Sequence, residues 1–516
     1  MLPIFALLLV LVVSLLSPLV DAAAFEFAAV VEKARTLAAE SYKAPTPVPE
    51  FLRELDYDDY RNIRFKPDAS LWRGSESGFE VMLVAPGSFY KRAVKINEID
   101  ADGVRPVEFD KSKFDFSNDS LARQIPADLG YAGFKLTYPL EAPEVQNQFM
   151  VFAGASYFRG VGQGDHFGIS ARGLAVNTGL RSGEEFPAFV EFWLERPSPD
   201  QDSIVMYALL DGPSVTGAYR FVISPGKLTE ADVTAQLFFR KDIELLGLAP
   251  LTSMFYYGEN TARPVGEWRP QVHDSDGLLI HNGGSGEWLW RPVINPESLR
   301  MSYFQTSNVQ GFGLMQRDRN FHQFEDAEAR YDNRPSAWVE TVGDWGKGEV
   351  VLVEIPTRDE SNDNIVAFWR PEEDLKAGQA MSRQYRLSFG REGLTDQPSA
   401  RATGTFVGHG NRLGGGAEEG AYRLIVDFKG GPLSGLNSSA AVVSNATGNE
   451  QVDVLEQYVE YVEPKNVWRL SLLVRPESEA PGILRAFLEA NGKALTETWT
   501  YELSPDRISG AAKNSR

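Results

Sequence analysis

The sequence predicts a mostly β protein, and three observations carry that prediction. Its 46 Gly and 30 Pro, together with 31 Phe, 18 Tyr and 10 Trp, suit many short strands joined by turns. From about residue 70 the chain consists of brief apolar or alternating segments bounded by Gly, Pro or Asn, such as FEVMLVA, FKLTYPL and VQNQFMVFAGASYF. No fixed-period repeat is found, which disfavours a propeller or a solenoid. A chain of 516 residues has room for more than one β domain.

The chain starts with a strongly apolar segment. Residues 2–20 carry no charge, and DAAA follows, with Ala22 and Ala24 in the A-x-A spacing of a cleavage site. A short membrane anchor is the alternative, but the helix breaker Pro18 favours a signal peptide over residues 1–24. No other stretch approaches the ~20 apolar residues that span a bilayer, so we expect a soluble mature protein without stable membrane insertion.

Residues 25–43 (FEFAAVVEKARTLAAESYK) are the first segment with helical periodicity. Their apolar positions recur every three or four residues, and TPVP then ends the pattern. A short amphipathic helix is predicted, with these apolar positions on one face: Phe27, Val30, Val31, Ala34, Leu37 and Ala38.

The remaining chain divides at a polar segment. Residues 25–390 form the predicted large β-sandwich domain, which ends on QYRLSFG, and 391–402 (REGLTDQPSARA) lose the apolar periodicity and form the linker. Residues 403–516 again alternate, in YRLIVDF, VWRLSLLVRP, GILRAFLEANG and ETWTYEL, at the spacing of an immunoglobulin-sized sandwich. Few polar aromatic clusters occur there, so an accessory or packing module is the simpler interpretation.

Composition excludes several functions. The chain has no cysteine, which rules out disulfides, thiolate metal sites and thiol nucleophiles, and an exported protein of this size without cysteine suits a bacterial periplasm. A net charge of −20 argues against nucleic acid or an anionic membrane as partner. G-x-S-x-G, P-loop and H-E-x-x-H motifs are absent.

The segment HDSDGLLIHNGGSGEWLWRP (273–292) concentrates unusual residue types. His273 and His281 could chelate a metal, but no third ligand is in register, and Asp274-Ser-Asp276-Gly277 is only part of a calcium loop. We expect no metal and no cofactor. Similar mixtures of aromatic and polar residues beside glycine recur between about residues 157 and 369, and such mixtures suit a saccharide groove, because sugars have apolar faces and hydroxyl rims.

Glycoside hydrolysis needs a protonated acid and a second carboxylate, and these can come from distant segments. Spacing alone cannot choose among the available residues, which are Asp274, Asp276, Glu287, Glu325, Asp326, Glu360 and Asp363. For substrate contact the candidates are Trp288, Trp290, Arg291, Trp338, Trp369, Tyr257 and Glu259. Trp288 and Trp290 alternate in a predicted strand, so both rings share one face and either line the groove or buttress it.

Long motifs, in order, give the chain a family resemblance. HDSDG, GEWLWRP, GFGLMQRDR, RPSAWVE, WGKGEVVLVEIPT and NDNIVAFW, with GASYFRGVG, FWLERP, YALLDGPSVTGAYRF and LGLAPLTSMFYYGEN, resemble the periplasmic glucan biosynthesis protein G/D family over nearly the whole chain. Without a twin-arginine signal, the chain looks most like the G branch.

The resemblance implies a galactose-mutarotase-like N-terminal β-sandwich with a long groove, followed by an immunoglobulin-like β-sandwich. It implies action on the β-1,2-glucan backbone of osmoregulated periplasmic glucans, as an inverting glycoside hydrolase or a transglycosylase. Asp363 matches the family's essential acid, and Asp274 its second carboxylate, with Asp276 as the alternative. Two other interpretations remain open: a non-catalytic glucan-binding partner of an inner-membrane glucan synthase, and a structural sandwich with incidental carboxylates.

Overall fold

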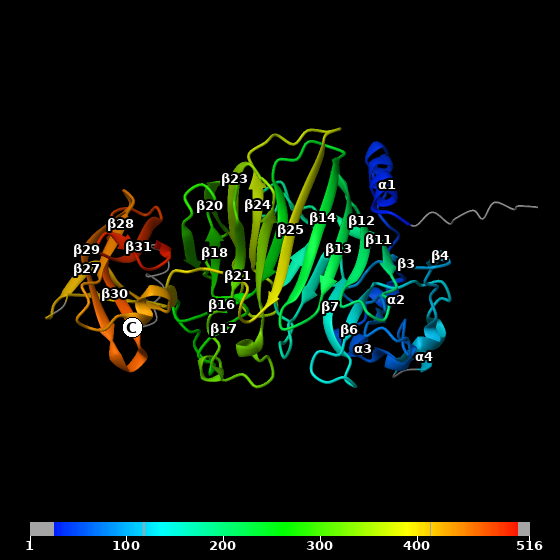
Figure 1. Ribbon diagram of the computed structural model, residues 1–516, viewed down its shortest axis with the longest axis horizontal. Coiled ribbons are helices and arrows are strands. Elements are labelled where there is room, and N and C mark those ends of the chain that lie inside the picture. Colours follow the sequence, from blue (N-terminus) through cyan, green and yellow to red (C-terminus); the bar gives the residue numbers. More distant parts are fainter. Residues whose placement is uncertain (1–24, 117–118, 413, 504–516) are drawn as a thin grey trace, which may run out of the picture.

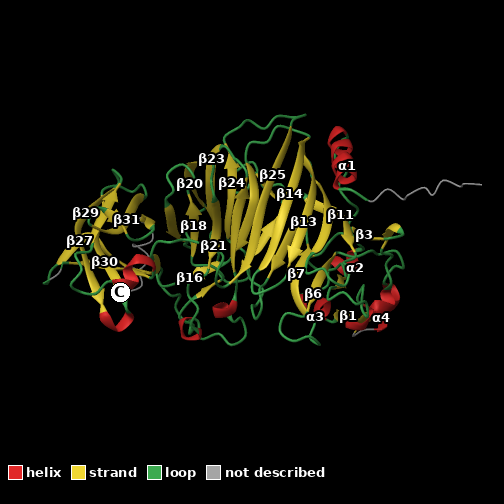
Figure 2. Ribbon diagram, viewed as in Figure 1, coloured by secondary structure: helices red, strands yellow, loops and turns green. Residues whose placement is uncertain are grey.

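A computed structural model describes residues 25–116, 119–412 and 414–503, and it is dominated by strands (Figures 1 and 2). The predicted mostly β fold, with a large N-terminal sandwich and a smaller C-terminal one, is confirmed. The predicted signal peptide over residues 1–24 and the last residues of the C-terminal domain lie outside the described part of the chain.

The predicted amphipathic helix is confirmed as α1 (Phe27–Ala39). Its apolar face is buried: Val30 and Ala34 are inaccessible to solvent and pack on the outer face of the large sheet, where the Thr216 hydroxyl donates to the carbonyl of Ala34. In Figure 1 this helix stands at the end of the molecule away from the C-terminal domain. The other helices are short: α2 (Glu50–Arg53), α3 (Tyr57–Arg61), α4 (Asp119–Gln124) and the 3₁₀ turns at Pro67–Ala69, Lys111–Lys113, Phe321–Gln323, Tyr331–Asn333, Gly431–Gly435 and Glu463–Lys465.

Two large sheets form the N-terminal sandwich. The first has the order β2-β6-β7-β8-β9-β15-β24-β23-β20, with β10 also paired to β15. Its strands are β2 (Glu80–Val84), β6 (Gly133–Tyr138), β7 (Asn147–Ala153), β8 (Tyr157–Gly160), β9 (Ser170–Arg172), β10 (Leu174–Val176), β15 (Leu246–Ser253), β20 (Arg300–Ser307), β23 (Lys347–Glu354) and β24 (Ile365–Pro371).

The second sheet runs β19-β18-β21-β22-β25-β14-β13-β12-β11-β3-β4 within this domain. Its strands are β3 (Lys95–Asp100), β4 (Gly103–Pro106), β11 (Ala188–Glu195), β12 (Ile204–Asp211), β13 (Val215–Ser224), β14 (Thr229–Phe239), β18 (Gly277–His281), β19 (Trp288–Pro292), β21 (Gly311–Met315), β22 (Ser336–Val342) and β25 (Ala380–Gly390). Two minor pairs, β1 (Ile63–Phe65) with β5 (Phe114–Phe116) and β16 (Phe255–Tyr257) with β17 (Val272–His273), lie outside both sheets.

Aromatic side chains fill the space between the two sheets. The ring of Phe152 on β7 meets the rings of Phe192 and Phe221 on the opposite sheet, at centroid distances of 5.9 and 5.4 Å. Along β14 buried and partly exposed residues alternate through most of its length, as one face covered by a second layer requires. The sequence encodes this layer as alternating apolar residues, so the fold class can be predicted before the pairing of the strands is known.

The C-terminal domain consists of two layers of strands that pack on one hydrophobic core. One sheet has the order β26-β27-β30-β29, from β26 (Arg401–Asn411), β27 (Ala417–Lys429), β29 (Val452–Val462) and β30 (Val467–Pro476). The other side holds β28 (Val443–Gly448), β31 (Gly482–Ala490), β32 (Lys493–Ala494) and β33 (Thr498–Leu503).

The second large sheet crosses from one domain into the other. β33 pairs in parallel with β19, with Leu289 opposite Thr498 and Trp290 opposite Trp499, so β28-β31-β33 continue that sheet. Residues 391–400, between β25 and β26, are the only covalent connection, but the hydrogen-bonded ladder is a second link. The two domains are therefore joined as one continuous β structure.

Candidate functional site

Asp363 lies near the end of the 356–364 loop, two residues before β24 begins. The next residue, Asn364, is buried and fixes this end of the loop: its Oδ1 accepts from the backbone N–H of Phe255 at 2.8 Å, and its Nδ2 donates to the carbonyls of Phe255 and Ile355, both at 3.0 Å. The side chain of Asp363 stays 32% exposed, and its Oδ2 is 3.8 Å from Nη2 of Arg159. A rigid backbone thus presents a solvent-accessible carboxylate.

Asp274 follows β17 and is almost completely buried. Its backbone N–H donates to the carbonyl of Met254 at 2.8 Å, and its Oδ1 accepts from Nη1 of Arg334 at 2.6 Å. Burial raises the pKa of Asp274 to about 6; Arg334 offsets part of that rise, and the charge of Asp363 adds to it. Asp363 is thus a charged neighbour of Asp274.

The Met254–Phe255 segment brings the two aspartates together. Met254 receives the N–H of Asp274, and Phe255 forms two hydrogen bonds with the side chain of Asn364, next to Asp363. Residues far apart in sequence thereby reach one site through a single backbone segment. The segment therefore links the backbone of Asp274 to the residue that follows Asp363.

Cations and tyrosines surround the pair. Arg172 lies over the ring of Tyr157 at 4.6 Å and forms an ion pair with Glu184 at 2.6 Å. Burial raises the pKa of the Tyr157 hydroxyl, Arg172 opposes that rise and Asp363 contributes to it. Arg334 lies 4.5 Å above the ring of Tyr331, which holds its guanidinium toward Asp274.

A second ion-pair network fixes the 356–364 loop from its other side. Arg269 forms ion pairs with Glu267 (2.8 Å), Asp326 (3.2 Å) and Glu360 (2.8 Å). Trp268, between the first two members of this network in sequence, is 65% exposed. An exposed indole leaves an aromatic face open to solvent, and such faces can stack on the apolar faces of sugars.

Several residues nominated for substrate contact are packed inside the protein. Trp369 is inaccessible to solvent in the core between the sheets, which corrects its assignment as a groove residue. Tyr257 is 1% exposed, and its hydroxyl donates to Glu267 and to the carbonyl of Arg269, so it supports the ion-pair network from behind. Neither ring is available to a ligand in this conformation.

The tryptophans of β19 and β22 belong to the domain junction. Trp288 stacks between His281 (4.1 Å) and Trp338 (5.7 Å), and Trp290 lies under the guanidinium of Arg317 at 3.5 Å. All three tryptophans belong to the core that contains the C-terminal domain. The structure therefore places them as buttressing residues and not as groove residues.

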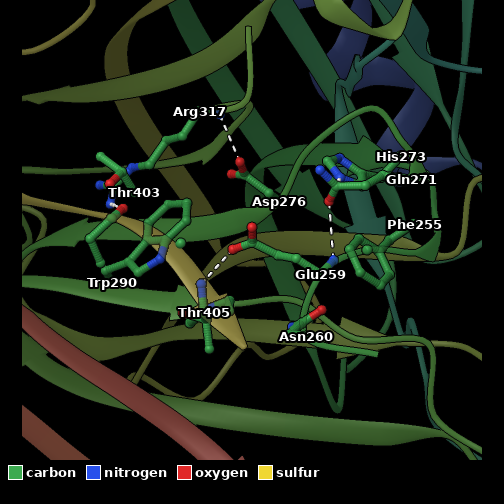
Figure 3. Close-up of a pocket in the computed structure, with 14 residues that line it drawn as sticks. Phe255, Glu259, Asn260, Gln271, His273, Asp276, Trp290, Arg317, Thr403 and Thr405 are labelled. Carbon is green, nitrogen blue, oxygen red and sulfur yellow. Dashed lines mark hydrogen bonds between the residues drawn. The ribbon is translucent and has the colours of Figure 1, made fainter. Parts of the chain in front are cut away.

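Arg291 and Glu259 also join the two domains. Arg291 is buried between Glu354 (3.5 Å) and Glu502 (3.9 Å). Figure 3 shows the Glu259 carboxylate pointing across the junction, where it accepts from the backbone N–H of Thr405 on β26. Glu259 and Thr405 line a small cavity between the two domains. Its volume of about 20 Å³ has room for roughly one water molecule and excludes a sugar ring.

Asp276, the alternative to Asp274, lines that same cavity (Figure 3). Its Oδ2 accepts from the backbone N–H groups of Arg317 and Asp318, at 2.9 and 3.2 Å. Burial, and then Asp318, raise its pKa, and burial with Asp318 likewise raises the pKa of Glu259. Asp276 is therefore committed to the junction, and Asp274 is the carboxylate beside Asp363.

The opening segment HDSDG has a structural explanation for its other residues. His273 is buried, with its ring nitrogens bonded to Gln316 and Gln271, and burial lowers its pKa to about 3, so it stays neutral. A Cβ at Gly277 would lie 2.2 Å from the ring of Trp290, so only glycine fits there. Within the described ranges no group of three or more His, Asp or Glu side chains is arranged to hold a metal ion.

The other carboxylates proposed from the sequence are paired elsewhere. Glu287 bonds Arg485 and Thr498, Glu325 bonds His322, and Asp326 and Glu360 bond Arg269. Sequence reasoning missed Arg159, Arg334, Tyr157 and Trp268. Both arginines lie in the motifs quoted above: Arg159 precedes a glycine in FRG, and Arg334 lies in the turn-like NRP. An arginine in such a segment was the available signal for a functional cation.

Fold and site together define a two-domain β-sandwich protein whose large domain carries a pair of acidic side chains between arginines. The family model described as "Periplasmic glucan biosynthesis protein, MdoG" matches residues 25–503, and the chain belongs to that family. No described helix has the length and apolar character needed to cross a membrane.

Two relatives of the chain carry the same name. "Glucans biosynthesis protein G" of Ralstonia nicotianae is 45% identical over 494 residues, covering 94% of this chain and 97% of the relative. The protein of that name from Pseudomonas paraeruginosa is 44% identical over 491 residues, covering 94% and 93%. Among solved structures, a galactose mutarotase related enzyme from Lactobacillus acidophilus is 10% identical, covers 52% of this chain and 93% of its own, and has a TM-score of 0.22.

Proposed function

We propose that this protein acts in the periplasm in the biosynthesis of osmoregulated glucans, on a β-1,2-glucan backbone, as an inverting glycoside hydrolase or transglycosylase. The family match and the names of its relatives support the biosynthetic role. The apolar segment 2–20 with its A-x-A site supports the location. The single observation that carries the catalytic part is the convergence of Asp274 and Asp363 on the Met254–Phe255 segment.

The two aspartates have environments suited to different roles. Asp363 is accessible and rigidly held, so its carboxyl can donate a proton to the leaving glycosidic oxygen. Asp274, with a pKa of about 6, is mostly ionised at neutral pH and still basic enough to accept a proton from water. Water oxygen bonds to the anomeric carbon as the glycosidic bond breaks; in transglycosylation a sugar hydroxyl takes the place of water.

A second candidate is a non-catalytic glucan-binding partner of the inner-membrane glucan synthase. The observation in its favour is the ion pair between Arg159 and Asp363, which must open before Asp363 can donate a proton. Under this alternative the same surface binds glucan without cleaving it.

The two functions are separated by a reducing-end assay on linear β-1,2-glucan. The wild-type protein should generate reducing ends, and Asp363→Asn should keep glucan binding while turnover falls by ~10²-fold or more. Asp359→Asn is the matched control, because Asp359 lies in the same loop, is exposed and bonds only within the loop, to Ser361. Binding by the wild type without turnover moves the assignment to the glucan-binding partner, and wild-type turnover in folded Asp363→Asn removes Asp363 from the acid role.

A further inference from the structure

A second cavity lies where the two domains meet, separate from the small one around Glu259. It measures about 470 Å³, within the usual range for ligand sites. The large domain contributes residues of the 256–264 and 295–297 segments, and the C-terminal domain contributes residues of β26, β27 and β33.

The lining has the chemistry that recognises a neutral saccharide. Tyr256 and Tyr422 are partly exposed and face the cavity from opposite domains, with Tyr257 and Tyr501 buried behind them. His409, on β26 opposite Tyr422, is exposed and contributes polar ring atoms. Aromatic faces flanked by hydrogen-bonding groups match the apolar faces and hydroxyl rims of sugars.

The walls of this cavity are held in place before any ligand binds. The hydroxyl of Tyr257 is fixed by Glu267 and by the carbonyl of Arg269. Asn260 donates to the carbonyl of Val293 at 3.0 Å, and its own carbonyl accepts from the hydroxyl of Tyr501. A pre-formed wall lowers the entropic cost of binding a flexible polymer.

Hydrogen bonds connect the cavity to the loop that ends at Asp363. Nδ2 of Asn295 donates to the carbonyls of Tyr256 (3.1 Å) and Thr357 (2.9 Å), and Oδ1 of Asn295 accepts from the N–H of Thr357 at 2.9 Å. Thr357 lies near the start of the 356–364 loop, which also contains Glu360, bound to Arg269, and Asp363. The larger of the two cavities between the domains is therefore connected to Asp363 through the 356–364 loop.

We infer that this interdomain cavity is a distal saccharide-binding site, which holds a remote stretch of the same glucan chain that reaches Asp363. The inference rests on the proposed function. It gives the C-terminal domain a direct part in substrate binding, through Tyr422 and His409, and it makes affinity depend on chain length, because only a long chain reaches both places at once.

Titration calorimetry of the full-length protein with short and with long linear β-1,2-glucans tests this site. Tyr422→Ala and His409→Ala should each weaken binding of long chains, roughly three- to tenfold for the tyrosine, and leave short-chain affinity unchanged. Tyr458→Ala is the matched control: Tyr458 is a partly buried tyrosine of the same domain, on β29, and does not line the cavity.

The outcomes separate this inference from the proposed function. If both variants fold and bind long chains as the wild type does, or lose affinity for short and long chains equally, the distal site is refuted while the assignment of Asp363 stands on its own assay. If the wild type binds neither length of glucan, the proposed function fails, and the distal site fails with it.

Discussion

Arg334 sets the pH range over which Asp274 can act as a base, and its replacement gives a quantitative prediction. Nη1 of Arg334 lies 2.6 Å from Oδ1 of the buried Asp274. An adjacent arginine lowers the pKa of an aspartate by about 1–3 units. Arg334→Gln should therefore raise the pKa of Asp274 from about 6 to roughly 7–9.

The predicted effect on turnover follows from the ionised fraction of Asp274. At about pH 7 that fraction falls from most of the protein to between a half and a hundredth, so turnover on β-1,2-glucan should fall roughly twofold to hundredfold. Because a higher pH deprotonates Asp274 again, the acidic limb of the pH–rate profile should move to higher pH by about 1–3 pH units. Arg334→Lys, which keeps a cation, should move the limb less.

The measurement is a reducing-end assay across pH for the wild type, both Arg334 variants and Arg386→Gln. Arg386 on β25 forms an exposed ion pair with Asp232 on β14, at 2.8 Å. Arg386→Gln therefore controls for the removal of one positive charge from the protein. An acidic limb that stays in place in Arg334→Gln, or a loss of turnover that no rise in pH restores, would refute the electrostatic role of Arg334.

Three further predictions concern binding and stability. Trp268→Ala should weaken glucan binding roughly three- to tenfold with no loss of stability, whereas Trp369→Ala should cost about 3–5 kcal/mol in urea unfolding and leave the affinity of the folded protein unchanged; the reverse pattern would return Trp369 to the site. Burial raises the pKa of Glu259, so the stability that this group contributes is present at low pH and is lost as pH rises through its folded-state pKa. The unfolding free energy of Glu259→Gln should therefore fall less than that of the wild type between about pH 5 and about pH 9. Glu287→Gln is the surface control, and equal slopes of unfolding free energy against pH in Glu259→Gln and the wild type would contradict this prediction. Glucan binding should be nearly independent of salt, since the ligand is neutral and releases no counterions, and a steep salt dependence in calorimetry would exclude the aromatic and hydrogen-bonded mode of binding.

The fold class and the first helix were predictable because both depend on local periodicity. The alternation of β14 and the helical spacing of Val30 and Ala34 are properties of single segments, and the structure buries those residues as expected. The sheet that continues from β19 into β33 was not predictable, because a parallel pair between such distant strands leaves no local pattern.

The site was predictable only in part, for the same physical reason. The proximity of Asp274 and Asp363 depends on two sets of hydrogen bonds to Met254 and Phe255, which no spacing rule encodes. Alternation in WLW correctly placed Trp288 and Trp290 on one face, but it could not show that the C-terminal domain covers that face. Trp268 lies in a loop without periodicity, so its exposure became visible only in the structure.

The most direct test of the account is a crystal structure of the Asp363→Asn protein with a linear β-1,2-glucan oligosaccharide. The account predicts that a glycosidic oxygen lies within hydrogen-bonding distance of the side chain at position 363, with a water molecule connecting the anomeric carbon to Asp274. An oligosaccharide that binds with neither position 363 nor Asp274 in reach of a glycosidic bond would contradict the central claim that this carboxylate pair acts on the glucan backbone.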